Sequence, residues 1–147
     1  MESCTVLPTQ QMEACGNAPK QQQMPLPAAG EAFSSHMAQL NAGALQVTLR
    51  VLKMNGSTML FLSGKDAERL DEFAIAMPAR PPSQQIVSTT FMGESGQSDS
   101  VVLATKLSMR YRRQFYVSMN LQLDSMARNQ FESALVSYMQ SNLELFV

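Results

Sequence analysis

The sequence is short of several features on which large classes of protein depend. Only 16% of its 147 residues are charged, against about 25% in an average soluble protein. Eleven basic and twelve acidic residues leave a net charge of −1, which argues against a protein that holds nucleic acid through a strong overall positive field. A surface with so little charge has little to keep it apart from partner proteins.

Cysteine and long apolar runs are also scarce. Cys4 and Cys15 are the only cysteines, too few for a disulfide-stapled secreted fold or a zinc module. The longest apolar runs, such as residues 59–62, are far too short to cross a membrane, and no basic patch followed by an apolar stretch opens the chain. We therefore expect no membrane association and a reducing compartment, the cytoplasm or also the nucleus.

The first 30 residues differ from the rest of the chain. They contain Pro8, Pro19, Pro25 and Pro27, three successive glutamines at 21–23, and no apolar periodicity. Such a segment cannot bury enough surface to offset the entropy lost on ordering. The sequence therefore predicts a flexible N-terminal tail over residues 1–30 and a single domain over residues 31–147.

Apolar periodicity in the remaining chain changes between two and about 3.6 residues. Alternation, apolar runs and turn residues predict five strands, and helical spacing predicts two helices. Asn55-Gly56 is a strong signal for a hairpin between the first two strands. The expected strands are 44–54, 59–62, 73–77, 85–92 and 115–121; the expected helices are 99–112 and 128–147. This order favours an α+β fold: a mostly antiparallel sheet of five to six strands with two main helices on one side, the last one C-terminal.

No catalytic or metal-binding constellation emerges from the sequence. His36 is the only histidine and lies at the edge of the tail, whereas both cysteines lie within it, where nothing can activate them. The acidic residues at 66, 68, 71 and 72 lack the spacing of a calcium loop, and Gly93-Glu94-Ser95-Gly96 lacks the lysine of a phosphate-binding loop. We expect neither an enzyme nor a cofactor or metal.

One group of charges could bind a partner. Lys106, Arg110 and Arg113, here called the basic stripe, are spaced i, i+4 and i+7 and would share one face of the helix over 99–112. Cations at the end of a helix also complement its dipole and can simply stay in water. The alternative is a docking patch for the carboxylates of a partner protein, and nucleic acid is a poorer candidate because few aromatic residues accompany the cations.

Four strings in order carry a resemblance to a known family. Leu60-Phe61-Leu62, the run Phe73–Met77, the run Val87–Gly93 followed by Ser95, and the stretch from Leu103 to Leu121 resemble proteasome assembly chaperone 4. The likeness covers about residues 44–146, and Phe33-Ser34 marks the opening segment less securely. The chain departs from the family pattern in its 30-residue tail and in longer stretches after Phe33 and around residues 55–59.

The resemblance implies a non-catalytic role and the antiparallel sheet with helices already expected. Members of such a family pair with a related chaperone, proteasome assembly chaperone 3. The pair holds a proteasome α-type subunit, chiefly the fifth, while the α-ring of the 20S particle forms, and it leaves as β-type subunits arrive. The alternative interpretation is a small α+β adaptor or scaffold protein of another complex.

Overall fold

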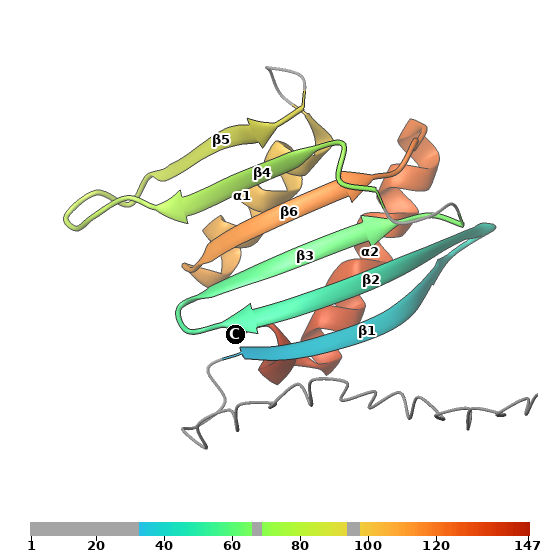
Figure 1. The fold of residues 1–147 in the computed structure, drawn as a ribbon, viewed down its shortest axis with the longest axis horizontal. Coiled ribbons are helices and arrows are strands. Elements are labelled where there is room, and N and C mark those ends of the chain that lie inside the picture. Colours follow the sequence, from blue (N-terminus) through green and yellow to red (C-terminus); the bar gives the residue numbers. More distant parts are fainter. Residues whose placement is uncertain (1–32, 66–68, 94–97) are drawn as a thin grey trace, which may run out of the picture.

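Six strands form one sheet in the order β1-β2-β3-β6-β4-β5 (Figure 1). The structure is a computed structural model that describes residues 33–65, 69–93 and 98–147. The strands are β1 (Phe33–Ala42), β2 (Leu45–Met54), β3 (Ser57–Ser63), β4 (Phe73–Pro78), β5 (Ile86–Met92) and β6 (Gln114–Asn120). The predicted tail over residues 1–30 lies outside the described residues.

The sheet is mixed, with one parallel pair. β3 and β6 run parallel, whereas the pairs β1–β2, β2–β3, β4–β5 and β4–β6 are antiparallel. Asn55-Gly56 joins β2 to β3, as the hairpin signal predicts, since Met54 pairs with Ser57 across this turn. The segment after β3 does not form a hairpin, because β6 lies between β3 and β4.

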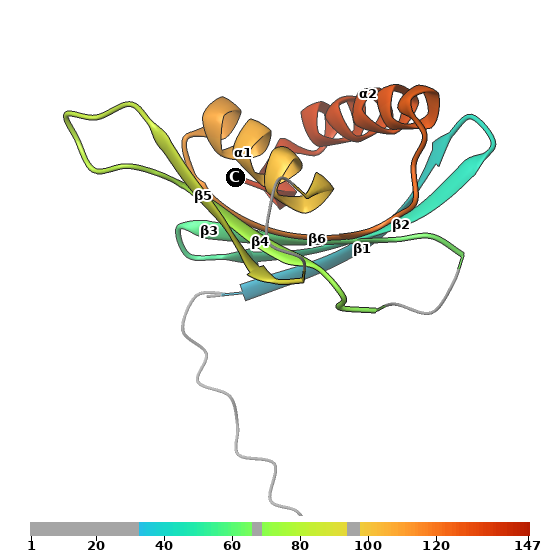
Figure 2. The ribbon, with the colours of Figure 1, turned by 90° about the horizontal axis from the view of Figure 1, so that it is seen from above.

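Two helices cover the same face of this sheet, and no helix formed by the described residues lies on the other face (Figure 2). The helices are α1 (Asp99–Tyr111) and α2 (Ser125–Ser141), followed by the short 3-10 helix η1 (Leu143–Leu145). Their apolar sides close the core against alternate residues of the strands. The strands contribute Val47, Leu49, Val51, Leu60, Phe115 and Val117, and the C-terminal half contributes Leu103 and Leu107 of α1, Phe131 and Leu135 of α2, and Phe146 after η1. The predicted α+β fold, with its mostly antiparallel sheet and C-terminal helix, is confirmed.

The first strand is absent from the sequence-based prediction. β1 pairs with β2 along its whole length, from Phe33 opposite Met54 to Ala42 opposite Leu45. Only Leu40 and Ala42 of this strand are buried, so the strand has no clear alternation of apolar and polar residues. β1 forms because its backbone pairs with that of β2. Such pairing between strands cannot be recognised from the local pattern of residues within one strand.

The helix ends differ from the predicted ones by a few residues. Ser98 caps α1, since its hydroxyl accepts a hydrogen bond from the amide of Val101, and Arg112 ends the helix in the left-handed conformation at φ 52°. The last helix begins at 125 instead of 128, because Asp124 provides its N-cap, and it ends at 141 instead of 147. Phe146 therefore reaches the core through η1 and not through a continuous helix.

The C-terminal residues are fastened to the start of β3 and the end of β2. The Thr58 hydroxyl is buried and donates to the carbonyl of Phe146 at 2.5 Å, and the Lys53 ammonium donates to the carbonyls of Glu144 and Val147, both at 2.7 Å. The Phe146 ring is fully buried and meets Tyr138 edge-on. These contacts hold the end of the chain against the helix-covered face.

Candidate protein-interaction surface

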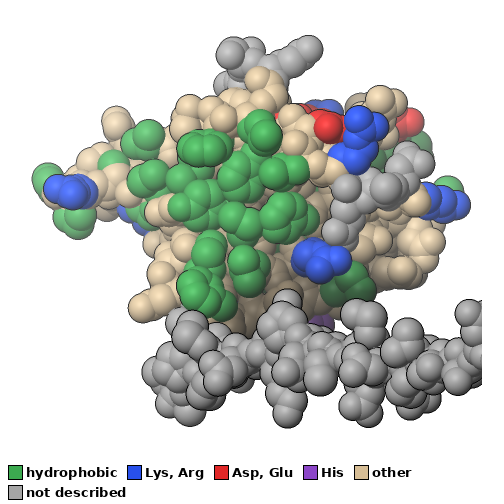
Figure 3. Space-filling model, viewed as in Figure 1, with side chains coloured by type: hydrophobic (Ala, Val, Ile, Leu, Met, Phe, Trp, Pro, Cys, Tyr) green, Lys and Arg blue, Asp and Glu red, His purple; other side chains and the backbone are tan. Residues whose placement is uncertain are grey.

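The uncovered face of the sheet carries a continuous area of hydrophobic side chains over its middle and toward β5 (Figure 3). Strand alternation places these side chains opposite the buried ones. Their exposure rises toward β5, where Val87 is 54% and Phe91 is 78% exposed. We call this area the open-face patch; it comprises Leu52, Met54, Met59, Phe61, Phe73, Ile75, Met77, Val87, Phe91 and Tyr116.

Three aromatic rings form a cluster on the β5 side of the open-face patch. Phe73 is stacked on Tyr116, with ring centroids 5.9 Å apart and planes within 9°, and Phe91 meets Phe73 edge-on at 6.0 Å. Both arrangements are ones that aromatic quadrupoles favour. The rings come from three neighbouring strands, β5, β4 and β6, so the backbone pairing fixes their positions before any partner arrives.

Charge is nearly absent from this face. Among the described strand residues whose side chains alternate to the open face, Arg50 is the only charged one, and its guanidinium donates to the sulfur of Met37 at 3.8 Å. Depletion of charge together with aromatic residues, methionine and a single arginine is the composition of the buried centre of a protein–protein interface. A patch of this kind on a small domain marks a site for a partner.

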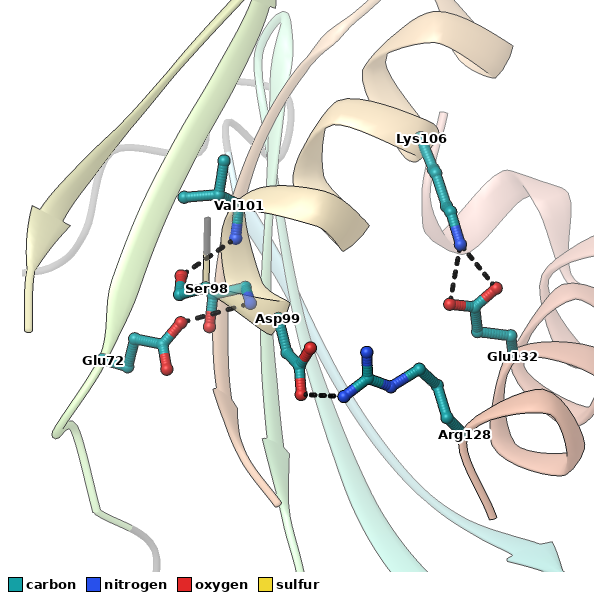
Figure 4. A network of polar contacts seen from close by, with 8 residues as sticks. Glu72, Ser98, Asp99, Val101, Lys106, Arg128 and Glu132 are labelled. Atoms are coloured by element: carbon teal, nitrogen blue, oxygen red, sulfur yellow. Dashed lines mark hydrogen bonds and ion pairs between the residues drawn. The ribbon is translucent and has the colours of Figure 1, made fainter. Parts of the chain in front are cut away.

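The basic stripe is divided by the structure. Lys106 lies on α1 but is already engaged, since its ammonium contacts both carboxylate oxygens of Glu132 on α2 at 2.7 and 2.8 Å (Figure 4). Arg110 is exposed in the last turn, where its guanidinium lies 5.7 Å from the Tyr111 ring centroid. Arg113 follows the helix C-cap, so the prediction that it continues the helical face is wrong.

The helix layer is held together by polar contacts between its two helices. Besides the Lys106–Glu132 pair, Arg128 of α2 contacts Asp99 at the start of α1 at 2.8 Å (Figure 4). Glu72 accepts a hydrogen bond from the amide of Ser100 at 3.2 Å, which ties β4 to the same helix end. The four side chains of the two ion pairs keep between 31% and 54% of their surface exposed to water. Pairs this exposed contribute little to the stability of the fold, so their main effect is to position the two helices.

The structure describes some of the residues that the sequence offers as candidates for catalysis or metal binding. His36 Nε2 lies 2.7 Å from the Tyr138 hydroxyl and its ring is stacked on that of Tyr138, which is a packing role. Asp71 pairs with Arg69 at 3.1 Å. Cys4, Cys15 and the acidic residues at 66 and 68 lie outside the described residues. Within the described ranges, no group of three histidine, cysteine or carboxylate side chains could hold a metal ion.

In the part of the chain that the structure describes, neither α1 nor α2 is long and apolar enough to span a bilayer.

Comparison with known proteins decides the family. A sequence model of the family described as proteasome assembly chaperone 4 matches residues 46–121. The chain belongs to this family. The matched range contains all four strings on which the resemblance depends, together with β3, β4, β5, α1 and β6. Residues before β2 and the whole of α2 lie outside it.

A solved structure supports the fold of the proteasome assembly chaperone family member described here. The chain is similar to one in the crystal structure of a chaperone complex for yeast 20S proteasome assembly, with a TM-score of 0.57 and 15% sequence identity. The alignment covers 78% of this chain and 98% of the yeast chain. No curated protein sequence matches the chain. At this level of identity the likeness concerns the arrangement of strands and helices.

Proposed function

We propose that this proteasome assembly chaperone is non-catalytic, that it pairs with proteasome assembly chaperone 3, and that the pair holds a proteasome α-type subunit, chiefly the fifth, while the α-ring forms. We place it in the cytoplasm, with the nucleus as the second compartment. The open-face patch is the observation that carries the proposal, since an apolar, nearly uncharged sheet face needs a protein to cover it.

The open face has the size that a stable pair requires. Six strands about 4.8 Å apart, each about seven residues long at about 3.3 Å per residue, present roughly 650 Å² in projection. A standard protein–protein interface buries about 800 Å² of accessible surface on each partner. Since side chains add relief to the projected area, the face of one sheet suffices for a long-lived pair.

The companion is assigned to this face and the client to a different one. A chaperone that must leave its client needs a modest, partly polar contact there, whereas it can keep a larger apolar contact with its partner. The helix layer and the ends of the sheet carry the charged residues, including Arg110 and Arg113 of the basic stripe. We therefore retain these two arginines as client-binding residues, and Lys106 contributes only what its pair with Glu132 leaves available.

Co-expression tests the pairing. The full-length chain and proteasome assembly chaperone 3 should elute together as a 1:1 complex in size-exclusion chromatography. The chain alone should be poorly soluble at high concentration and usable only in dilute solution. A soluble monomer at high concentration whose elution does not change when the companion is added would contradict the proposal.

Charge reversal tests the client contact. The double variant R110E/R113E should fold and still bind the companion, since neither side chain lies on the open face. It should capture α-type subunits more slowly and with a weaker salt dependence, because charges at the rim of an interface mainly set the association rate. Unchanged capture at low ionic strength would show that these arginines are only solvated. An adaptor of another complex would instead purify without proteasome subunits.

A further inference from the structure

Four arginines gather at one end of the molecule, where β4 ends, β5 begins and α1 gives way to β6. Arg80 lies in the loop between β4 and β5, Arg110 in the last turn of α1, Arg112 at its C-cap, and Arg113 just before β6. The loop projects beyond the sheet at this end (Figures 1 and 2). We call these four residues the arginine corner. The arginine corner shares Arg110 and Arg113 with the basic stripe but does not include Lys106. Its other two members, Arg80 and Arg112, are not related to the stripe by helical spacing.

The backbone of the arginine corner is fixed by hydrogen bonds. The Arg112 guanidinium donates to the Gln84 carbonyl at 2.9 Å, which joins the helix end to the projecting loop. Two backbone hydrogen bonds close the loop. The amide of Ala79 donates to the Gln85 carbonyl at 2.9 Å, and the amide of Ser83 donates to the Arg80 carbonyl at 3.1 Å. The loop therefore fixes the backbone at Arg80 on the same end of the molecule as the C-terminus of α1, so a ligand has to order the arginine side chains but not the backbone that carries them.

Within the described ranges, no ion pair to a corner arginine is found. The ion pairs found there join Arg69 to Asp71, Lys106 to Glu132 and Arg128 to Asp99, and none includes a corner arginine. The dipole of α1 explains a cation in its last turn. It does not explain Arg80, which belongs to a loop between two strands. A chain with a net charge of −1 thus separates four positive charges at one end.

We propose that the arginine corner is a docking site for an acidic segment of a client protein, one with several carboxylates in succession. A guanidinium forms two parallel hydrogen bonds with a carboxylate, and arginine is favoured for such recognition over lysine. Single-stranded nucleic acid would need exposed rings on which bases stack. The nearest ring, Tyr111, is half-buried and lies against Arg110, so a peptide fits the site better.

That the acidic segment belongs to a proteasome subunit rests on the function proposed above, but the site itself can be tested without any subunit. The probe is a fluorescein-labelled hexaglutamate peptide, with hexaglutamine as its neutral counterpart. Fluorescence anisotropy with the full-length chain at 25 mM and 200 mM NaCl, about a threefold change in Debye length, should show binding of hexaglutamate alone, weaker at the higher salt.

Two double variants, each of which removes two positive charges, distinguish binding at the arginine corner from a general effect of net charge. R80Q/R110Q removes two corner arginines whose side chains, unlike that of Arg112, do not brace the loop by a hydrogen bond to a backbone carbonyl in the part of the chain that the structure describes. This variant should weaken hexaglutamate binding about fivefold or more. K65Q/R69Q removes two cations near the opposite end of β3 and β4 and should change binding less than about twofold. Circular dichroism and thermal melting confirm that both variants are folded.

Three results would overturn the proposal. These are absence of hexaglutamate binding at 25 mM NaCl, equal weakening by the two double variants, and tighter binding of a single-stranded oligouridine that R80Q/R110Q abolishes. The outcome is also separable from that of the function proposed above. A chain that binds hexaglutamate through the corner but captures no α-type subunit would count against the proteasome client and not against the site.

Discussion

Phe91 provides the sharpest test of the open-face patch. Its ring is 78% exposed at the outer strand of the sheet and rests on Phe73. An aromatic side chain buries about 150–250 Å² in a complete contact, so covering this ring with a partner would remove about 110 Å² that an alanine would not offer. At about 25 cal/mol per Å², Phe91→Ala should weaken companion binding by about 2–3 kcal/mol, or about 30- to 150-fold in Kd.

Calorimetric titration of the companion into the chain measures this loss, and Met126→Ala is the matched control. Met126 is 70% exposed, comparable with Phe91, but it lies on α2, on the helix side of the molecule. Its removal should change the Kd by less than about twofold. Thermal melting of both variants guards against a loss of fold, because Phe91→Ala also removes one edge-to-face contact with Phe73. If Phe91→Ala binds within about threefold of the wild type, or if both variants lose equally, the open face is not the companion's site.

Three further perturbations test the fold. Deleting residues 1–30 should leave the Tm within error, because their composition offers no apolar face to pack; a drop of several degrees would show that the tail packs on the domain. Gly93→Ala should lower the free energy of unfolding by about 1–3 kcal/mol in urea titration, since its φ is 108° and a Cβ there would lie 3.2 Å from the Asp71 carbonyl oxygen; an unchanged midpoint would contradict this geometry. Phe146→Ala should lower the free energy of unfolding by about 3–5 kcal/mol in the same titration, because the ring is fully buried. Leu143→Ala, at an exposed position, should lower it by less than about 1 kcal/mol. Equal losses in the two variants would mean that the C-terminal residues do not close the core.

The elements that the sequence predicts correctly are those whose burial repeats at short range. Val47, Leu49 and Val51 are all buried on one side of β2, and Leu103 and Leu107 on one side of α1, so period alone identifies them. Gly93 belongs to one of the four strings that resemble the family, and the backbone explains why a glycine stands there. Its φ is 108°, a value that residues with a side chain rarely adopt. Long-range pairing is different: nothing local to β6 tells that it inserts between β3 and β4.

The site was predicted less well than the fold, for a related reason. Counting along a helix placed Arg113 with Lys106 and Arg110, but the left-handed Arg112 ends α1 before the count is complete. The counterion Glu132 comes from another helix. Arg80 belongs to a loop that meets the end of α1 only through the hydrogen bond from Arg112 to the carbonyl of Gln84, 28 residues away in the sequence. The open-face patch depends on knowing that both helices cover one face, so apolar residues such as Met59 and Phe61 could not be assigned to a partner from alternation alone.

The central claim is that this chain works as one half of a chaperone pair that holds a proteasome α-type subunit. Affinity purification of the tagged full-length chain from its own cells, followed by native mass spectrometry, measures this directly. The account predicts a 1:1 complex with proteasome assembly chaperone 3 that carries an α-type subunit, chiefly the fifth, and the loss of the companion in Phe91→Ala but not in Met126→Ala. Purification of the chain with other proteins and without either of these partners would contradict it.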